Sequence, residues 1–236
     1  MSGFLVNKSA IVTGGTRGIG RAITESLLKE GASVVICGHT SKHVGTALEE
    51  LREHGRCEGL AADVTDIQQV TRLFEFADKT LGGLDILVNN AGIGIFRPVA
   101  DLTPDEWQRT LGTNLTGVFY CCHQAVPRMR HRGGGAIINI SSLAGKNAFA
   151  GGAAYNASKF GLNGFSEALM LDHRNDRIRV TYVMPGSVDT DFSTRSERAS
   201  WKIAPADVAC MVLAVLRMPE QTMVSRIEMR PSMPPK

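Results

Sequence analysis

The segment AIVTGGTRGIG, residues 10–20, joins a short apolar run to a glycine-rich turn. The run Ala10–Val12 predicts a buried strand, and the spacing of apolar residues after the turn predicts an amphipathic helix over about residues 18–30. A strand followed at once by a tight turn and a helix is typical of a βαβ unit. The segment therefore predicts the first strand and helix of a parallel sheet.

The glycines of this turn have the places that a phosphate-binding loop requires. They would allow a tight bend, let the backbone approach a pyrophosphate and bring the helix against the strand. The first turn of the helix then offers free N–H groups and a partial positive charge to phosphates. The spacing is G-x-x-x-G-x-G and not G-x-G-x-x-G, so a merely tight turn is the alternative. The candidate cofactor contacts in the turn are Gly14, Arg17, Gly18, Ile19 and Gly20.

Strand and helix patterns alternate along the rest of the chain. Further apolar runs predict strands at 33–37, 57–61, 85–89, 136–140, 178–183 and 226–229. Helical patterns fill the gaps, including a long one over about 104–131. Seven short strands separated by helices predict a doubly wound (Rossmann) parallel sheet of the α/β class, with helices on both faces. No linker, repeat or low-complexity tract divides the sequence, so residues 1–236 are expected to form a single domain.

Composition and charge argue against several classes of function. Of the 236 residues, 43% are hydrophobic and 21% are charged, as in ordinary globular proteins. The net charge of +3 is too small to indicate a nucleic-acid partner. The longest apolar run is about half of what spans a bilayer, so no membrane insertion is expected. Five cysteines without C-x-x-C spacing predict reduced thiols, no metal site and a cytoplasmic location.

The end of the second expected strand lacks an acidic residue. Folds that prefer NAD usually carry Asp or Glu there to hold the ribose 2′-hydroxyl. Here Gly38 takes that place, His39 follows it, and no carboxylate occurs in residues 32–48. A 2′-phosphate would be repelled by a carboxylate and attracted by these donors and by Arg17. We therefore expect NADP(H) as the cofactor, and the alternative is that these are solvated loop residues and the cofactor choice is loose.

The segment YNASK, residues 155–159, places a tyrosine four residues before a lysine. On a helix these side chains lie on one face, with β-carbons roughly 5–6 Å apart. A free tyrosine has a pKa of about 10, so removing its proton at pH 7 costs roughly 4 kcal/mol. A positive charge about 4 Å away returns a similar amount at intermediate dielectric. Tyr155 and Lys159 are therefore a candidate acid/base pair, against the alternative of two ordinary side chains on a surface helix.

Fragments spread over the chain share their order and spacing with one enzyme family. They are TGGTRGIG (13–20), Asp63–Val64, Asn89–Gly92, Asn114, NISSLAG (139–145), YNASK (155–159) and PGSVDT (185–190). With these fragments the chain resembles the short-chain dehydrogenase/reductases over nearly its full length. Its N-terminal half is most similar to the 3-oxoacyl carrier-protein reductases. The C-terminal end SRIEMRPSMPPK lacks the Asp-Gly-Gly turn of many relatives.

The resemblance implies a role for each matching residue. Tyr155 would protonate a carbonyl oxygen during reduction, and Lys159 would hold the nicotinamide ribose and lower the pKa of the tyrosine. Ser142 would polarise the substrate carbonyl, and Asn114 would hold a water that links Lys159 to solvent. Each of these residues also has a plain structural reading, such as a turn residue for Ser142. The other implied cofactor contacts are Asp63 and Val64 at the adenine, Asn90, Pro185, Gly186, and Val188 with Thr190 at the carboxamide.

These residues together predict an oxidoreductase. Hydride transfer leaves charge on the substrate oxygen, which needs hydrogen-bond donors and a proton source in place. We expect NADPH-dependent reduction of a ketone or aldehyde to an alcohol, with 3-oxoacyl thioesters among the candidate substrates. The alternatives are an NAD(P)-dependent alcohol or sugar dehydrogenase and a non-catalytic dinucleotide-binding sensor. The intact set of Asn114, Ser142, Tyr155 and Lys159 argues against the sensor.

Residues 187–204 are expected to form a short lid over the substrate, with Phe192 and Trp201 as its bulky members. Further apolar walls are expected from Phe96, Leu143 and Phe149, and plain core packing is the alternative for each.

Small residues follow one another on neighbouring turns of the helix that carries the tyrosine, at Ala157, Gly161 and Gly164. Such a strip permits close approach of another element, which can belong to the same subunit. The habit of the family of pairing this helix across a two-fold axis implies a homodimer or homotetramer.

Overall fold

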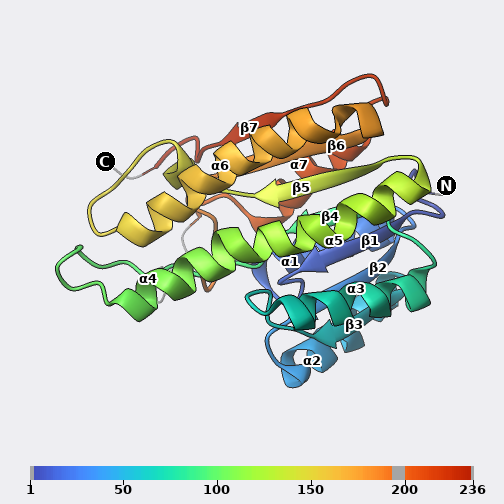
Figure 1. Ribbon diagram of the computed structural model, residues 1–236, viewed down its shortest axis with the longest axis horizontal. Helices are drawn as coiled ribbons and strands as arrows, with labels where there is room; N and C mark the ends of the chain where they lie inside the picture. The colour runs from blue at the N-terminus through green and yellow to red at the C-terminus, as the bar shows by residue number, and fades with distance from the viewer. Residues whose placement is uncertain (1–2, 193–199, 235–236) are drawn as a thin grey trace.

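One parallel sheet of seven strands forms the centre of the computed structural model, which describes residues 3–192 and 200–234 (Figure 1). The strands are β1 (Ser9–Thr13), β2 (Ser33–Gly38), β3 (Cys57–Ala61), β4 (Ile86–Asn89), β5 (Gly135–Ile140), β6 (Ile178–Pro185) and β7 (Arg226–Met229). Their spatial order is β3-β2-β1-β4-β5-β6-β7, and all neighbours pair in parallel. The winding direction reverses between β1 and β4, as in a doubly wound sheet. This confirms the Rossmann-type α/β fold expected from the sequence.

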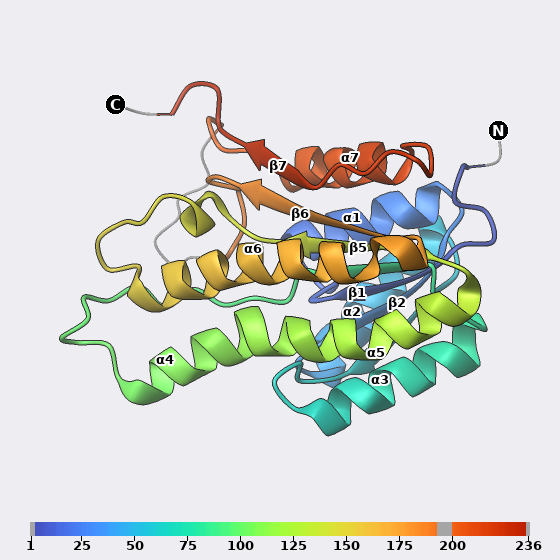
Figure 2. The same cartoon turned by 45° about the horizontal axis from the view of Figure 1, so that its top comes forward.

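Helices cover both faces of the sheet (Figure 2). They are α1 (Gly18–Lys29), α2 (Ser41–Leu51), α3 (Ile67–Leu81), α4 (Pro104–Leu111), α5 (Gly117–Arg132), α6 (Ala153–His173) and α7 (Pro205–Leu216). Buried side chains of α1, α2 and α7 pack on one face, and those of α3, α5 and α6 pack on the other. The sheet is therefore enclosed along its length, and only its edges and strand ends are open.

Alternation along the central strands explains why they read as continuous apolar runs. In β1, Ala10 and Val12 join the core beneath α1 and α7, whereas Ile11 joins the core beneath α3 and α5. In β2, Ile36 and Val35 divide in the same way. Successive side chains of a strand point to opposite faces, and both faces here are covered by helices. Each residue of such a strand must therefore be apolar or hydrogen-bonded.

The long helix expected over about 104–131 is present and contains one irregular turn. A π-helical turn, Gly112–Thr116, separates α4 from α5, and the N–H of Gly117 donates to the carbonyl oxygen of Gly112. Glycine, threonine and asparagine in this turn have low helix propensity, which lowers the cost of widening the helix. The widened turn carries Asn114, whose side chain is completely buried. The expected long helix is therefore present, and the sequence analysis did not predict the π turn that positions a candidate site residue.

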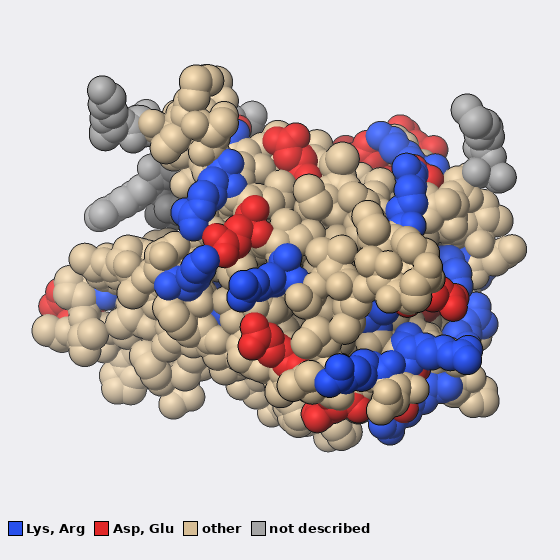
Figure 3. Space-filling view, turned by 90° about the horizontal axis from the view of Figure 1, so that it is seen from above, with Lys and Arg blue, Asp and Glu red and all other residues tan. Residues whose placement is uncertain are grey.

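Surface features agree with the ordinary composition of the chain. Side chains of both charge signs are interspersed on the face seen in Figure 3. No helix within the described residues has the length and apolar character needed to cross a membrane. All five cysteines are free, and only Cys210 is exposed.

Candidate active site

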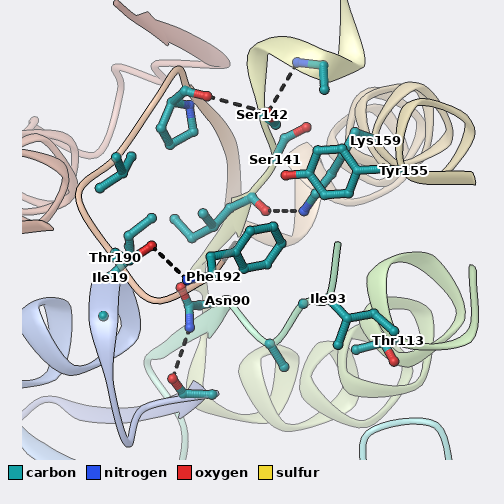
Figure 4. A pocket seen from close by; sticks show the side chains of 18 of the residues that line it. Ile19, Asn90, Ile93, Thr113, Ser141, Ser142, Tyr155, Lys159, Thr190 and Phe192 are labelled. Carbon is teal, nitrogen blue, oxygen red and sulfur yellow. Dashed lines mark hydrogen bonds between the residues drawn. The ribbon is translucent and has the colours of Figure 1, made fainter. Parts of the chain in front are cut away.

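A cavity of about 1760 Å³ opens where the strands end, at the carboxyl edge of the sheet (Figure 4). Residues that follow each strand from β1 to β6 line it, because parallel strands all end at the same edge. The same cavity contains the glycine turn at one end and Tyr155 at the other. The expected site residues that line it are Gly14, Arg17, Gly18, Ile19, His39, Asp63, Val64, Asn90, Ser142, Tyr155, Lys159, Pro185, Gly186, Val188 and Thr190.

The glycine turn has the backbone that its sequence requires. Gly14 and Gly18 have φ values of 64° and 55°, in the left-handed region that side chains disfavour. Gly20 lies behind the cavity surface, where a β-carbon would be 2.3 Å from Nδ2 of Asn90. That amide donates hydrogen bonds of 3.1 and 3.0 Å to the carbonyl oxygens of Thr13 and Gly14. Gly20 and Asn90 therefore brace the turn from behind.

The N-terminus of α1 faces the cavity with free donors. Arg17 is the N-cap residue, and its side chain makes no capping hydrogen bond to the first turn. The backbone N–H groups of that turn are then available to an anion, and the helix dipole favours negative charge there. These features fit the pyrophosphate of a dinucleotide.

The end of β2 has no room for an acidic side chain in its present arrangement. A β-carbon on Gly38 would lie 2.7 Å from Cγ2 of Thr16. The next residue, His39, is exposed, and its Nδ1 lies 3.7 Å from a carboxylate oxygen of Asp63. This rim thus presents an imidazole, together with Arg17, where the sequence analysis places the ribose 2′-position.

Tyr155 and Lys159 lie in the first turns of α6 and face the cavity (Figure 4). The ammonium of Lys159 is buried and donates a 2.9 Å hydrogen bond to the carbonyl oxygen of Ile140. It lies 5.8 Å from the centroid of the Tyr155 ring. The helix therefore brings phenol and ammonium to one face, as the four-residue spacing predicted.

Ser142 follows β5 and begins a short 3₁₀ turn, Leu143–Gly145. Its hydroxyl oxygen accepts a 3.1 Å hydrogen bond from the N–H of Ala144 and donates a 3.5 Å bond to the carbonyl oxygen of Pro185. The bond to Pro185 is long, so the hydroxyl proton is available to a better acceptor. Ser142 and Tyr155 both line the cavity, from different elements.

Aromatic rings surround Tyr155 on the cavity side. Its ring centroid lies 5.4 Å from that of Phe96 and 5.9 Å from that of Phe192. Phe96 in turn lies 5.7 Å from Phe149. Leu143 and Trp201 also line the cavity, as expected from the sequence. The wall around the phenol is therefore mainly apolar.

Comparison with known proteins agrees with this geometry. The family model described as short chain dehydrogenase matches residues 8–201 of this chain. The chain belongs to the short-chain dehydrogenase family. The match covers the glycine turn, Ser142, Tyr155 and Lys159, so the residues that carried the resemblance lie inside the matched region.

Three similar proteins are named as dehydrogenases or oxidoreductases. A 3alpha-hydroxysteroid dehydrogenase of Mediterraneibacter gnavus is 40% identical over 191 residues, covering 80% of this chain and 76% of that protein. An uncharacterized oxidoreductase of Staphylococcus aureus strain USA300 is 32% identical, covering 96% of this chain and 98% of its own. A metagenomic short-chain oxidoreductase solved in complex with NADP is 34% identical, with a TM-score of 0.86 and coverage of 98% and 99%.

Burial changes the proton affinities at the site. It raises the pKa of Tyr155 above its ordinary value, and an interaction with the Ser142 hydroxyl opposes this shift only in part. Burial also lowers the pKa of Lys159 to about 8. The resemblance to the short-chain dehydrogenases implied a lowered pKa for the tyrosine. In the structure the pKa of Tyr155 is raised instead, because desolvation of the phenol outweighs its hydrogen bond with Ser142. The ammonium of Lys159 donates its hydrogen bond to the carbonyl oxygen of Ile140.

Asn114 is placed differently from the other three residues expected from the family. It does not line the cavity, and its Oδ1 accepts a 2.8 Å hydrogen bond from the N–H of Ile93. Its Nδ2 donates to the carbonyl oxygen of Ile93 at 2.9 Å and to the hydroxyl of Ser158 at 3.0 Å. Both amide protons are thus engaged, so the expected water could bind only to an oxygen of Asn114.

Part of the cavity wall comes from residues that no sequence pattern predicts there. Arg230, Pro231 and Pro234, from the C-terminal segment, line the cavity, and no motif marks them.

Within the lid expected over 187–204, residues 193–199 lie outside the described part of the chain. The described ends of that segment pair, since the N–H of Asp189 donates to Ile203 and the N–H of Ile203 donates to Ser187. Within the described residues, no group of three or more His, Cys, Asp and Glu could hold a metal ion.

Proposed function

We propose that this short-chain dehydrogenase reduces a ketone or aldehyde to an alcohol with NADPH. The observation that carries the proposal is the single cavity that holds the glycine turn of α1 together with Ser142, Tyr155 and Lys159. A dinucleotide supplies the hydride when it is bound, and the chain supplies the rest of the chemistry. Gly14, the first turn of α1 and Asn90 would hold that cofactor.

Tyr155 would provide the proton that the reduced oxygen requires. A tyrosine keeps its proton near neutral pH, and burial of Tyr155 raises its pKa further, so the phenol is present as the acid that reduction needs. Efficient transfer of that proton favours a pKa closer to the working pH. Ser142 would donate its hydroxyl proton as a hydrogen bond to the same oxygen. Two donors at the position where negative charge develops stabilise that charge without rearrangement. Lys159 would bind the ribose and keep positive charge close to the phenol.

The preference for NADPH rests on the end of β2. Gly38 and His39 leave this rim without a carboxylate at the position that would hold a ribose 2′-hydroxyl, and Arg17 lines the same end of the cavity. A 2′-phosphate would gain charge-assisted hydrogen bonds from Arg17 and a hydrogen bond from the imidazole of His39. The 34% identical relative that was solved with NADP is consistent with this preference.

A large apolar alcohol or ketone is the second candidate for the substrate. Phe96, Phe149 and Phe192 form an apolar wall of tilted rings near Tyr155, which suits a large apolar body better than a sugar. The relative named as a 3alpha-hydroxysteroid dehydrogenase favours the same class. Phe192 and Trp201, at the described ends of the lid expected over residues 187–204, line the cavity and would contact such a body.

We also propose that the enzyme is a homodimer or homotetramer. Phe119 of α5 and Phe160 of α6 are each 46% exposed, and a second subunit packed on these two helices would bury them. In the strip of small residues on α6, the side chain of Leu115 of the same chain fills the space beside Gly161. The space beside Gly164 is open. Light scattering on the wild type and on Phe119→Glu tests this assembly. A wild type that runs as a monomer would contradict it.

Oxidation of NADPH, followed by its absorbance, tests the proposed reaction. The panel contains small ketones, 3-oxoacyl thioesters and 3-ketosteroids, each with NADPH and with NADH. Consumption of NADPH by at least one carbonyl, lost in Tyr155→Phe, is the expected result. A folded wild type that binds NADPH but reduces nothing in the panel would favour a dinucleotide-binding sensor. Faster turnover with NADH would contradict the cofactor assignment.

A further inference from the structure

Asn163 lies on the same face of α6 as Tyr155 and Lys159, because the three residues are spaced by four. Its Oδ1 accepts a 2.5 Å hydrogen bond from the hydroxyl of Ser141, and its Nδ2 donates a 3.0 Å bond to the carbonyl oxygen of Gly145. Ser141 and Gly145 stand at the two ends of the short segment that carries Ser142. One side chain of the tyrosine helix therefore holds both ends of the serine segment.

The ends of this segment are fixed by further contacts. The N–H of Ser141 donates a 2.7 Å hydrogen bond to the carbonyl oxygen of Val183 in β6. At the other end, a β-carbon on Gly145 would lie 2.6 Å from Nδ2 of Asn163, so the amide approaches this closely only because residue 145 is glycine. Between these ends, the hydroxyl of Ser142 donates a long 3.5 Å bond to the carbonyl oxygen of Pro185, and it also interacts with Tyr155.

Asn156 holds the next part of the same loop. It is 7% exposed, and its Nδ2 donates hydrogen bonds to the carbonyl oxygens of Ala144 at 2.7 Å and Asn147 at 3.3 Å. Its Oδ1 accepts a 3.4 Å bond from the N–H of Phe149. This part of the loop ends in the Phe149 ring, which packs against Phe96 in the cavity wall.

We propose that Asn163 and Asn156 are positioning residues, which fix respectively the Ser142 hydroxyl and the Phe149 wall relative to Tyr155. Neither asparagine lines the cavity, and neither has a role in the proposed reaction. This inference rests on the proposed function, since it assigns tasks within that reaction. The physical reason is that a donor must stand within a few tenths of an ångström of its productive position, and a side chain on a loop reaches this only when the loop is held.

The two asparagines should affect different kinetic constants. Loss of the Asn163 contacts frees Ser142, which acts on the reacting oxygen, so kcat falls. Misplacement of a reacting group by about 1 Å can cost about 100-fold, so we expect a loss of about 10- to 100-fold in Asn163→Leu. Loss of the Asn156 contacts frees the Phe149 wall. Asn156→Leu should therefore raise KM for a bulky ketone by about tenfold and leave a small ketone nearly unchanged, as expected when an interaction serves binding alone.

Kinetics and hydrogen exchange of the full chain test the inference. The variants are Asn163→Leu, Ser141→Ala and their combination, together with Asn156→Leu. Ser166→Ala is the matched control, because Ser166 is buried on the same helix and hydrogen-bonded to Asn139, away from the loop. The measurements are kcat and KM for a small and a bulky ketone, the melting temperature, and exchange of the amides in residues 141–149.

The double variant separates positioning from general damage. If Asn163 acts through Ser141, adding Ser141→Ala to Asn163→Leu should lower kcat little further, since the shared contact is already lost. Faster exchange of the amides in residues 141–149 is expected in Asn163→Leu and in Asn156→Leu, and not in Ser166→Ala. Unchanged kcat in a folded Asn163→Leu would overturn the inference. So would an equal loss of kcat in Ser166→Ala at the same melting temperature.

The proposed function and the inference fail in different ways. If the wild type reduces no carbonyl, the proposed function fails and the exchange data still decide whether Asn163 and Asn156 hold the loop. Unchanged exchange in both variants would then overturn the positioning role. If Asn163→Leu does not fold, Asn163→Asp keeps the acceptor for Ser141 and removes the donor to Gly145. An intermediate loss of kcat is expected for that variant, and an unchanged kcat would contradict the inference.

Discussion

The ammonium of Lys159 donates a 2.9 Å hydrogen bond to the carbonyl oxygen of Ile140, the last residue of β5. This bond ties the helix that carries Tyr155 to the strand from which Ser142 follows. The ammonium is removed from water, and this burial lowers the pKa of Lys159 from its ordinary 10.5 to about 8. One carbonyl oxygen replaces neither the hydration shell of the ammonium nor a carboxylate partner, so the charged form is held at a cost.

This cost makes the stability depend on pH in a defined direction. The folded state binds the proton of Lys159 less tightly than the unfolded state, so the penalty is fully present below about pH 8 and is relieved as the pH rises toward 10.5. In Lys159→Met the penalty is absent. The unfolding free energy of the wild type minus that of the variant should rise by up to about 3 kcal/mol across this window, at about 1.4 kcal/mol per pKa unit.

Urea unfolding of both proteins at several pH values from 7 to 10 measures this difference. Subtracting the variant removes the contributions of groups that titrate in both proteins, including Tyr155. A difference that falls with pH would mean that Lys159 is better solvated, or better paired, than its buried position indicates.

Removing the phenolic hydroxyl should abolish turnover without removing the cofactor site. In Tyr155→Phe the ring still packs edge-on against Phe96, at the 5.4 Å centroid distance of the wild type, so the wall is retained. The proton donor is lost, and kcat should fall by about 100- to 10,000-fold. NADPH binding, measured by fluorescence, should stay within a few-fold of the wild type. Retained turnover would show that another group protonates the product.

A carboxylate at position 39 should reverse the cofactor preference. His39 is exposed beside Asp63, and His39→Asp places a second negative charge where the 2′-phosphate is expected. We expect the Kd for NADPH to rise by about tenfold or more, which corresponds to about 1.4 kcal/mol, and the Kd for NADH to change little. His131→Asp, at the far end of α5, makes the same charge change away from the cavity and serves as the control. Equal effects of the two changes would mean that His39 acts only through net charge.

A methyl group at position 94 should narrow the substrate wall. A β-carbon on Gly94 would lie 2.7 Å from ring atoms of both Phe96 and Phe192, so both rings must shift in Gly94→Ala. Overpacking of this kind costs about 1–3 kcal/mol. We expect KM for a bulky ketone to rise by about tenfold or more, with a smaller change for a small ketone. Equal effects on both substrates would indicate that the two rings do not touch the substrate.

Gly45→Ala is the matched glycine control for this prediction. Gly45 lies on the exposed side of α2, and a β-carbon there meets nothing within 4 Å. The variant should be more stable than the wild type by about 0.5–1 kcal/mol, because glycine in a helix interior costs about that much relative to alanine. Kinetic constants should not change.

Much of the architecture could be predicted because local sequence patterns determine it. Short apolar runs separated by helical patterns predicted all seven strands to within two residues at each end. Since parallel strands end at one edge, the motifs after them had to meet there, and the cavity contains nearly all of them. The four-residue spacing of Tyr155 and Lys159 likewise fixed their common helix face.

Other features depend on contacts between distant segments. The π turn at Gly112–Thr116 forms where Asn114 bonds to Ile93, a partner 21 residues away. Asn163 carried no recognisable motif, and its importance appears only when Ser141 and Gly145 are brought against it. The direction of the Tyr155 pKa depends on how deeply the surrounding rings bury the phenol, which no spacing in the sequence expresses.

The amino-acid sequence alone determined the order of strands and helices, because periodicity and short-range spacing act within one element. Fragments spread along the chain indicated the family. The sequence also predicted the reacting groups Ser142, Tyr155 and Lys159, which line one cavity. The tertiary structure alone decided how these groups are held and tuned. Its contributions are the asparagine contacts behind Ser142, the aromatic wall from three separate loops, and the burial that shifts the pKa of Tyr155 and Lys159 in opposite directions. Desolvation and packing are properties of surroundings, and surroundings are assembled from residues that are far apart along the chain.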